Sequence, residues 1–139
     1  MEKETEGQKY KRLDAEYEKL LLSSNTDMDL IEKRREELEE IEDTFVSRNL
    51  EGKELEKAGK VDEAIALYEK NIKEGFDGSH PYTRLAIIYS KKGLLDDEIR
   101  VLKKAVWVFG DIVHRDRSDR FPKLDGFKKR LEKANKKRL

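Results

Sequence analysis

Apolar residues recur along most of this chain every three or four positions, with charged residues between them. The first stripe of this kind consists of Tyr10, Leu13, Tyr17, Leu20 and Leu21. Because residues at this spacing share one face of an α-helix, the stripe predicts an amphipathic helix over about residues 3–22. The polar segment 23–26 contains Ser, Asn and Thr, which favour turns and helix caps, and we expect it to end that helix.

Six further stretches show the same spacing and predict six more helices. They cover residues 27–42, 45–58, 62–74, 81–92, 96–109 and a last region that begins at Pro122. A break between the first two of these helices is expected because Asp43 and Thr44 can cap the second one. The polar segment 110–120 is expected to be a loop, with Trp107 and Phe121 holding the last helix against its neighbours.

The stretch 52–106 repeats its own pattern after 34 residues. The matched pairs are Gly52 with Ala86, Leu55 with Tyr89, Gly59 with Gly93, Asp62 with Asp96, Glu63 with Asp97, Ile65 with Ile99, Tyr68 with Leu102 and Ile72 with Val106. In each copy the small residue allows two helices to approach closely, the glycine ends the first helix in a left-handed conformation, and the acidic pair favours the start of the second helix. A fixed period of this length indicates stacked helical hairpins. The alternative is two unrelated hairpins of similar length.

The repeated stretch resembles the tetratricopeptide repeat family, whose period is also 34 residues. The second repeat, residues 79–110, has the motif residues Tyr82, Leu85, Ala86, Tyr89, Leu102 and Ala105, and it departs from the motif at Glu98 and Gly110. The first repeat, residues 45–78, has Gly52, Leu55, Ala64 and Tyr68, and it departs at Arg48, Glu51, Asn71 and Phe76. The resemblance implies an all-α fold in which helical hairpins stack into a right-handed superhelix.

The flanking regions complete this predicted architecture. Residues 1–44 are expected to form an N-terminal helical hairpin, and residues 111–139 a loop followed by a basic capping helix. The hairpin allows two interpretations. A shift by 34 residues places Ile31 on Ile65, which favours a degenerate third repeat, whereas the apolar stripe of the first helix also fits two heptads of a short coiled-coil arm.

Composition supports a helical fold and excludes some kinds of chemistry. Of the 139 residues, 45% are charged and 36% are hydrophobic, which is little apolar material for a sheet-based core but ordinary for amphipathic helices. The chain has no cysteine, so disulfides and thiolate metal sites are excluded. It also has no apolar run near the roughly 18 residues that span a bilayer, and no apolar signal core at its N-terminus. We expect a cytoplasmic protein without a membrane partner.

No arrangement of residues typical of a reaction centre is present. Phosphate-binding loops, nucleophile elbows and dinucleotide fingerprints are absent. The two histidines, His80 and His114, lack a second ligand at the spacing of a zinc site. The acidic pairs 62–63 and 96–97 occupy matching helix starts, where they stabilise the helix dipole. The sequence therefore predicts a protein that is not an enzyme and has no catalytic residues, cofactor or metal site.

The resemblance also implies a binding surface. In the tetratricopeptide repeat family the first helix of each repeat lines a concave groove that contacts peptides. By register, its contact positions here are Val46, Asn49, Leu50, Lys53, Glu56 and Lys57 in the first repeat and His80, Thr83, Arg84, Ile87, Ser90 and Lys91 in the second. The candidate peptide-binding residues among them are Asn49, Lys53, Lys57, Thr83, Arg84, Ile87 and Lys91. This implies a non-catalytic protein- or peptide-binding scaffold, unless the N-terminal helix covers Leu50 and Ile87 and closes the groove.

The distribution of charge leaves two other functions open. The formal net charge is zero, but acidic residues outnumber basic ones 15 to 8 in residues 1–44, and basic residues outnumber acidic ones 11 to 4 in residues 114–139. Attraction between these ends would produce a self-assembling structural protein, a homo-oligomer. The basic segment 128–138 also has the charge to contact nucleic acid, although no aromatic residue interleaves with its lysines and arginines.

Overall fold

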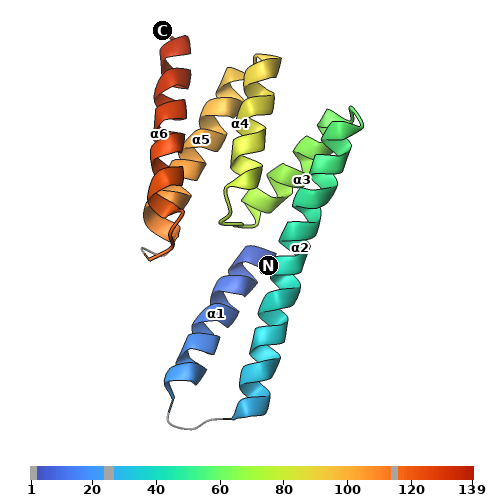
Figure 1. Ribbon diagram of the computed structural model, residues 1–139, viewed down its shortest axis with the longest axis vertical. Coiled ribbons are helices and arrows are strands. Elements are labelled where there is room, and N and C mark those ends of the chain that lie inside the picture. Colours follow the sequence, from blue (N-terminus) through green and yellow to red (C-terminus); the bar gives the residue numbers. More distant parts are fainter. Residues whose placement is uncertain (1–2, 24–26, 114–115) are drawn as a thin grey trace. The chain divides into compact units, whose positions relative to one another are not determined.

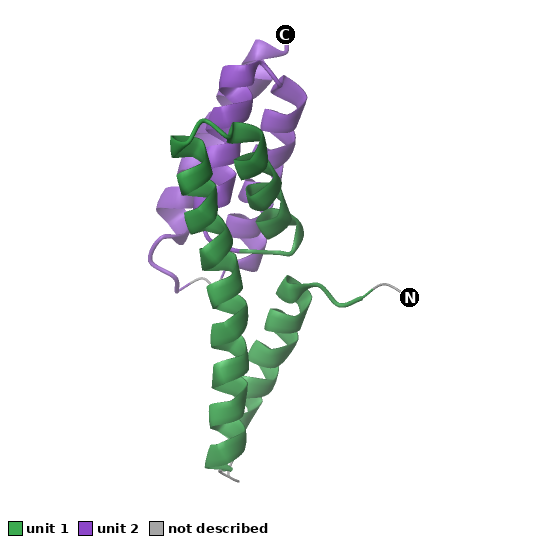
Figure 2. Cartoon of the chain, turned by 90° about the vertical axis from the view of Figure 1, so that its right-hand side faces the viewer, with its two compact units in different colours: residues 1–76 green, residues 77–139 purple. Residues whose placement is uncertain are grey.

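The computed structural model is all-helical and describes residues 3–23, 27–113 and 116–139, in which no β-strand occurs (Figure 1). Its elements are α1 (Glu6–Leu22), α2 (Met28–Lys57), α3 (Val61–Lys73), α4 (His80–Lys92), α5 (Leu95–Trp107), the π-helical segment η1 (Val108–Ile112) and α6 (Arg120–Lys137). The chain divides into two compact units, which are coloured separately in Figure 2. Unit 1, Met1–Phe76, contains α1 to α3, and unit 2, Asp77–Leu139, contains α4 to α6.

Unit 1 is built along the 30-residue helix α2. The buried residues of α2 are Ile31, Leu38, Ile41, Phe45, Asn49 and Gly52. Because these positions are three, four or seven residues apart, they form one seam along a single face of the helix. Helix α1 packs on the N-terminal half of the seam and α3 on the C-terminal half (Figure 1). Both α1 and α3 thus pack on one long helix, α2.

The predicted break between residues 42 and 45 is wrong, because α2 runs through it without interruption. Neither glycine nor proline occurs between Met28 and Glu51, so the two residue types least favourable in a helix interior are absent there. The hydroxyl of Thr44 donates to the carbonyl of Glu40, 3.1 Å away, and is therefore satisfied inside the helix instead of capping a new one. The second helix of the N-terminal hairpin and the first helix of the predicted first repeat are consequently one and the same helix.

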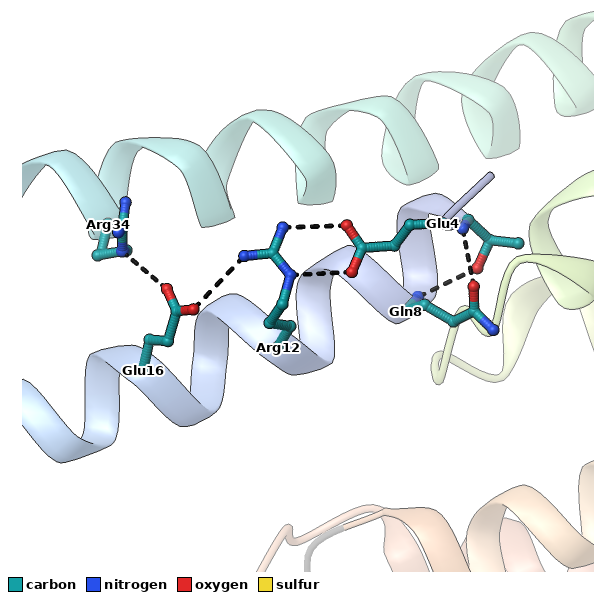
Figure 3. Close-up of polar contacts among 6 residues, drawn as sticks. Glu4, Gln8, Arg12, Glu16 and Arg34 are labelled. Carbon is teal, nitrogen blue, oxygen red and sulfur yellow. Dashed lines mark hydrogen bonds and ion pairs between the residues drawn. The ribbon is translucent and has the colours of Figure 1, made fainter. Parts of the chain in front are cut away.

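Helix α1 begins at a capping box, three residues later than predicted. The amide of Gln8 donates to the Thr5 hydroxyl at 3.1 Å, and the amide of Thr5 donates to the Gln8 side chain at 2.9 Å. Figure 3 shows these bonds and a row of ion pairs, in which Arg12 contacts Glu4 at 2.9 Å and Glu16 at 3.4 Å. The row ends on α2, where Arg34 lies 3.0 Å from Glu16. Exposed pairs of this kind contribute little to stability.

The attachment of α1 to α2 depends instead on apolar contacts. Leu13 is 1% exposed and packs with Leu38, Ile41 and Phe45 of α2. Tyr10, Tyr17 and Phe76 are partly buried against this cluster. Burying a large apolar side chain stabilises a fold by about 1.5–3 kcal/mol, which exceeds the contribution of the surface ion pairs. Apolar contacts thus join α1 to α2 as a helical hairpin.

A glycine lets the start of α1 lie against the end of α3. A Cβ atom placed on Gly7 would come within 1.4 Å of the carbonyl oxygen of Glu74. No side chain fits there, since a real carbon needs more than twice that separation. Gly75 ends α3 with a φ of 90°, in the region where glycine is favoured. Two glycines therefore allow the ends of α1 and α3 to meet on the seam of α2.

The 34-residue period of the sequence reappears in the backbone of both units. Helices α3 and α5 have 13 residues each, and both of their bounds differ by 34 positions. The turns before them also match: Gly59 and Gly93 have φ values of 78° and 74°. After each glycine, an amide bonds back to a carbonyl five residues earlier, from Lys60 to Leu55 at 2.8 Å and from Leu94 to Tyr89 at 2.9 Å. The predicted left-handed glycine at the end of each first helix is confirmed.

The core of unit 2 has an aromatic cluster at its centre. The rings of Tyr82 and Phe127 are 6.2 Å apart, and those of Phe109 and Phe127 are 5.4 Å apart. Burial raises the pKa of the Tyr82 phenol far above its ordinary value, because the charged form would lie in an apolar environment. Trp107 and Phe121, which the sequence predicted to hold the last helix against its neighbours, are not part of this cluster, and 52% and 67% of these residues are exposed. Phe127, six residues after Phe121 on α6, contributes the aromatic ring instead.

The region between α5 and α6 also differs from the prediction. Residues 108–112 continue α5 as a π-helix, and α6 begins at Arg120 instead of Pro122. Val108 and Phe109 are buried and continue the apolar face of α5 formed by Val101, Leu102 and Ala105, whereas Trp107 beside them is exposed. After η1, the guanidinium of Arg117 donates to Asp119 at 2.6 Å and to the carbonyl of Asp77 at 2.7 Å. These contacts tie the start of α6 to the start of unit 2.

Candidate binding surface on helix α2

Four exposed residues form a second stripe along the C-terminal half of α2. They are Val46, Leu50, Lys53 and Lys57, and we call them the α2 stripe. Their spacing of four, three and four residues places them on one flank of the helix, turned by roughly 100° from the buried seam. Val46 is 48% exposed and Leu50 is 56% exposed. The α2 stripe is therefore an apolar pair followed by two cations, over about 16 Å of helix.

The two lysines are available for an external partner. Lys53 has no carboxylate partner in the described ranges. Lys57 lies 3.4 Å from Glu54, but both side chains are about three-quarters exposed, so this pair is weak and easily exchanged for another. The leucine is equally accessible: α1 packs on the other half of α2 and leaves Leu50 in solvent. A surface closed over Leu50 by the N-terminal helix, the alternative raised above, is not what the structure shows.

Asn49 does not belong to this surface, and its predicted role as a peptide contact is wrong. It is only 8% exposed and lies in the buried seam. The side-chain amide of Asn71 on α3 donates to the Asn49 carbonyl at 2.9 Å and to the backbone carbonyl of Phe45 at 2.9 Å. Buried polar groups are costly unless they are paired, so Asn49 serves to satisfy Asn71.

This pairing extends into a network that sequence reasoning missed. Arg48 donates to the oxygen of the Asn71 side chain at 3.2 Å and to the carboxylate of Glu74 at 2.5 Å. Arg48 and Asn71 both stand where the tetratricopeptide motif expects other residues, and the structure shows that these departures contact each other. In the sequence, the signal was that two neighbouring helices each have a polar residue, Arg48 and Asn71, where the motif expects another residue type. Such residues can satisfy each other by hydrogen bonding.

The other four candidate residues lie on α4 of unit 2. Thr83, Arg84 and Ile87 are half-buried, and Lys91 in the last turn is exposed. Their spacing places Thr83, Ile87 and Lys91 along one flank of α4. The seven predicted residues therefore divide between two helices, three on α2 and four on α4. Of the three predicted residues on α2, Lys53 and Lys57 belong to the α2 stripe and Asn49 does not. Val46 and Leu50 are the other two members of the stripe.

The described part of the chain contains no cluster of three or more His, Asp or Glu side chains suited to binding a metal ion. His114 lies outside the described residues. The acidic residues 62–63 and 96–97 lie in the first turns of α3 and α5, where they were expected to act on the helix dipole. No helix in the described ranges is both long and apolar enough to cross a bilayer.

Comparisons with protein-family models, with curated proteins and with solved structures gave no match to this chain.

Proposed function

We propose that this chain is a non-catalytic protein-binding module whose binding surface includes the α2 stripe. The observation that carries the proposal is the exposure of Val46 and Leu50 directly beside Lys53 and Lys57. Apolar side chains gathered on an otherwise charged surface are of the kind that partners cover. Neighbouring lysines favour partners of negative charge. The expected partner is a peptide segment in which acidic side chains follow apolar ones.

The resemblance to tetratricopeptide repeats extends this proposal to α4. In that family the first helices of successive repeats line one concave surface, to which α4 would contribute Thr83, Arg84, Ile87 and Lys91. The equal lengths of α3 and α5 and the matching turns before them support a repeated unit of this type. On this proposal the chain is a scaffold that positions a partner and carries out no reaction of its own.

The test is a selection of peptides on the intact chain, followed by measured affinities. A display library of random 12-residue peptides is selected against the wild type, and the enriched peptides are titrated by fluorescence anisotropy. We expect enrichment of sequences that combine Leu, Ile or Phe with Asp or Glu. Both Leu50→Ser and Lys53→Glu/Lys57→Glu are expected to raise the Kd about tenfold or more, since a central apolar contact or a reversed charge pair is each worth more than about 1 kcal/mol.

The matched control reverses a charge elsewhere on the same helix. Lys33 is exposed and lies 20 residues before Lys53, about 30 Å along the axis of α2. Lys33→Glu should leave the Kd within a factor of two. Equal weakening by Lys33→Glu would mean that general charge, not the α2 stripe, determines binding, and the proposal would be wrong.

Arg84→Glu tests the contribution of α4 separately. If the first helices of both repeats contact the same peptide, this variant weakens binding together with the variants of the α2 stripe. If only the α2 variants weaken it, the protein-binding proposal stands and the tetratricopeptide-like groove does not. Circular dichroism at 222 nm of every variant excludes loss of helix as the cause.

A further inference from the structure

An open pocket lies on unit 2 where α5, η1 and α6 come together. Its volume is about 530 Å³, within the range of small-molecule sites. Val106 and Leu124 supply its apolar lining and Trp107 an aromatic one. Lys103 of α5 and Arg120 and Lys128 of α6 supply three positive charges, and Asp111 of η1 supplies one negative charge. All of these residues belong to unit 2, whereas the residues of the α2 stripe belong to unit 1.

Trp107 is the last residue of α5, directly before the π-helical segment, and its side chain is available at this pocket. Val108 and Phe109, which follow it, continue the buried face of α5, while Trp107 stays 52% exposed. Gly110 lines the same pocket and adds no side chain to it. Segments of π-helix occur frequently at functional sites, and a large aromatic side chain in contact with solvent is a common anchor for a ligand.

The positive charges at the pocket exceed the negative charge that the protein places beside them. Neither Lys103 nor Lys128 has a carboxylate partner among the residues that the structure describes. Arg120 donates from Nη2 to the carbonyl of Gly110 at 2.6 Å and stacks over Phe121 at 4.9 Å. Its buried Nε has no hydrogen-bond acceptor in the described ranges. Asp111 offsets only one of the three cations.

At the C-terminal end of α6, by contrast, the cations at positions 136–138 have carboxylate partners within the protein. Lys137 lies 3.6 Å from the buried Glu98 and donates to Ser90 at 3.1 Å. Arg138 pairs with Asp96, and Lys136 lies 3.8 Å from Glu132. These cations attach the helix to α4 and α5 or to its own carboxylates. The cations at positions 136–138 are therefore engaged by carboxylates of the protein, whereas Lys128 at the pocket has no such partner in the described ranges.

From this arrangement we propose that the pocket binds a nucleotide unit, with its base against Trp107 and its phosphate held by Lys103, Lys128 and Arg120. Sites for single-stranded nucleic acid combine aromatic faces, on which bases stack, with cations that contact phosphates. A cation–π contribution from arginine commonly accompanies them. Two sources share this chemistry, a free nucleotide and a strand of single-stranded nucleic acid. An acidic peptide would satisfy the lysines, but it would make no use of a flat aromatic face.

The chain offers a direct optical readout, because Trp107 is its only tryptophan. Its fluorescence is excited at 295 nm while a (dT)15 oligonucleotide, AMP or a ten-residue polyglutamate is added to the full chain, with correction for absorption. Stacking of a base on Trp107 quenches this emission. Quenching by AMP as well as by the oligonucleotide identifies a free nucleotide as sufficient, and quenching by the oligonucleotide alone identifies single-stranded nucleic acid; both support the proposal.

Variants separate the pocket from general charge. With fluorescein-labelled (dT)15 or, for a free nucleotide, fluorescein-labelled AMP, Lys103→Glu/Lys128→Glu should raise the Kd at least tenfold, and Trp107→Leu about fivefold or more. The matched control is Lys136→Glu, which reverses the same charge on the same helix eight residues beyond Lys128 and should change the Kd less than twofold. All four side chains are exposed, so the variants are expected to fold.

Three outcomes would overturn the proposal. The first is an absence of quenching by both the oligonucleotide and AMP. The second is weakening by Lys136→Glu equal to that caused by the pocket variants, which would indicate attraction to the basic helix as a whole. The third is binding of polyglutamate without binding of either nucleotide probe, which would make the pocket a peptide site.

Discussion

Replacement of Gly52 by alanine measures the close approach of α2 and α3. A Cβ atom at this position would lie 2.5 Å from Cε1 of Tyr68, 2.7 Å from its Cζ and 3.0 Å from its hydroxyl oxygen. Carbon atoms in contact are normally about 3.5–4.0 Å apart. The overlap is therefore about 1 Å or more with the nearest ring atom, and either the ring or the helix must move.

The ring has little room to move. Tyr68 is 0% exposed, and its hydroxyl donates to the carboxylate of Glu56 at 2.6 Å. Overpacking of a filled core costs about 1–3 kcal/mol, and a ring fixed at both ends places this site near the upper limit. Alanine in a helix interior is favoured over glycine by about 1 kcal/mol, which acts in the opposite direction. We expect Gly52→Ala to lower the free energy of unfolding by about 2 kcal/mol.

The assay is urea unfolding followed by circular dichroism at 222 nm, with Trp107 fluorescence recorded in parallel as a probe of unit 2 alone. A double-mutant cycle assigns the cause. In a Tyr68→Leu background the overlap is gone, so Gly52→Ala should be neutral or stabilise by up to about 1 kcal/mol. Gly126→Ala is the matched control: it is also in a helix interior, but a Cβ there meets no atom within 4 Å, and we expect a gain of similar size.

A Gly52→Ala variant as stable as the wild type would refute this reasoning. A loss of the same size in the Tyr68→Leu background would also refute it, because the cost would then not come from the tyrosine ring.

Three further changes test other contacts. Asn71→Ala leaves the carbonyl of Phe45 without its side-chain donor and should lower the free energy of unfolding by about 2 kcal/mol in urea titrations, whereas no change would show that the buried network is neutral. Gly7→Ala should weaken the attachment of α1, seen as faster hydrogen exchange in α1 than in the wild type, because its Cβ would lie 1.4 Å from a backbone oxygen at the end of α3. The hydrogen bond from Arg117 holds the pKa of Asp119 below its ordinary value of 3.8, so this carboxylate stabilises unit 2 above that pH and the stabilisation is lost as the pH falls below it. The difference in unfolding free energy between wild type and Asp119→Asn, followed by Trp107 fluorescence, should therefore shrink from pH 6 to pH 2.5, and a constant difference would contradict this assignment.

Much of the local structure followed from the sequence. Helix-period apolar stripes predicted an all-helical chain, and the 34-residue repeat predicted helices α3 and α5 to within a residue or two at each end. Gly59 and Gly93 were identified as left-handed ends because few other residues adopt that conformation without strain. Helices and their glycine ends are determined by residues close to one another in the chain, so the sequence pattern alone is enough to predict them.

The failures concern interactions across the fold. Asp43 and Thr44 are good capping residues, yet the continuous seam of α2 packs α1 and α3 on one straight helix, and this packing overrides the local signal for a break. Asn49 has the chemistry of a peptide contact, but the amide of Asn71, 22 residues away, decides that it is buried.

The sequence by itself determined the helical class, the repeat and the amphipathic faces, because backbone propensity and periodicity act over a few residues. Only the tertiary structure decided which polar side chains are buried and which surfaces stay open. It leaves Val46 and Leu50 exposed beside two lysines, and it brings Trp107 of α5 next to Arg120 and Lys128 of α6. Contacts of this kind join residues from different helices, and their geometry depends on how those helices pack.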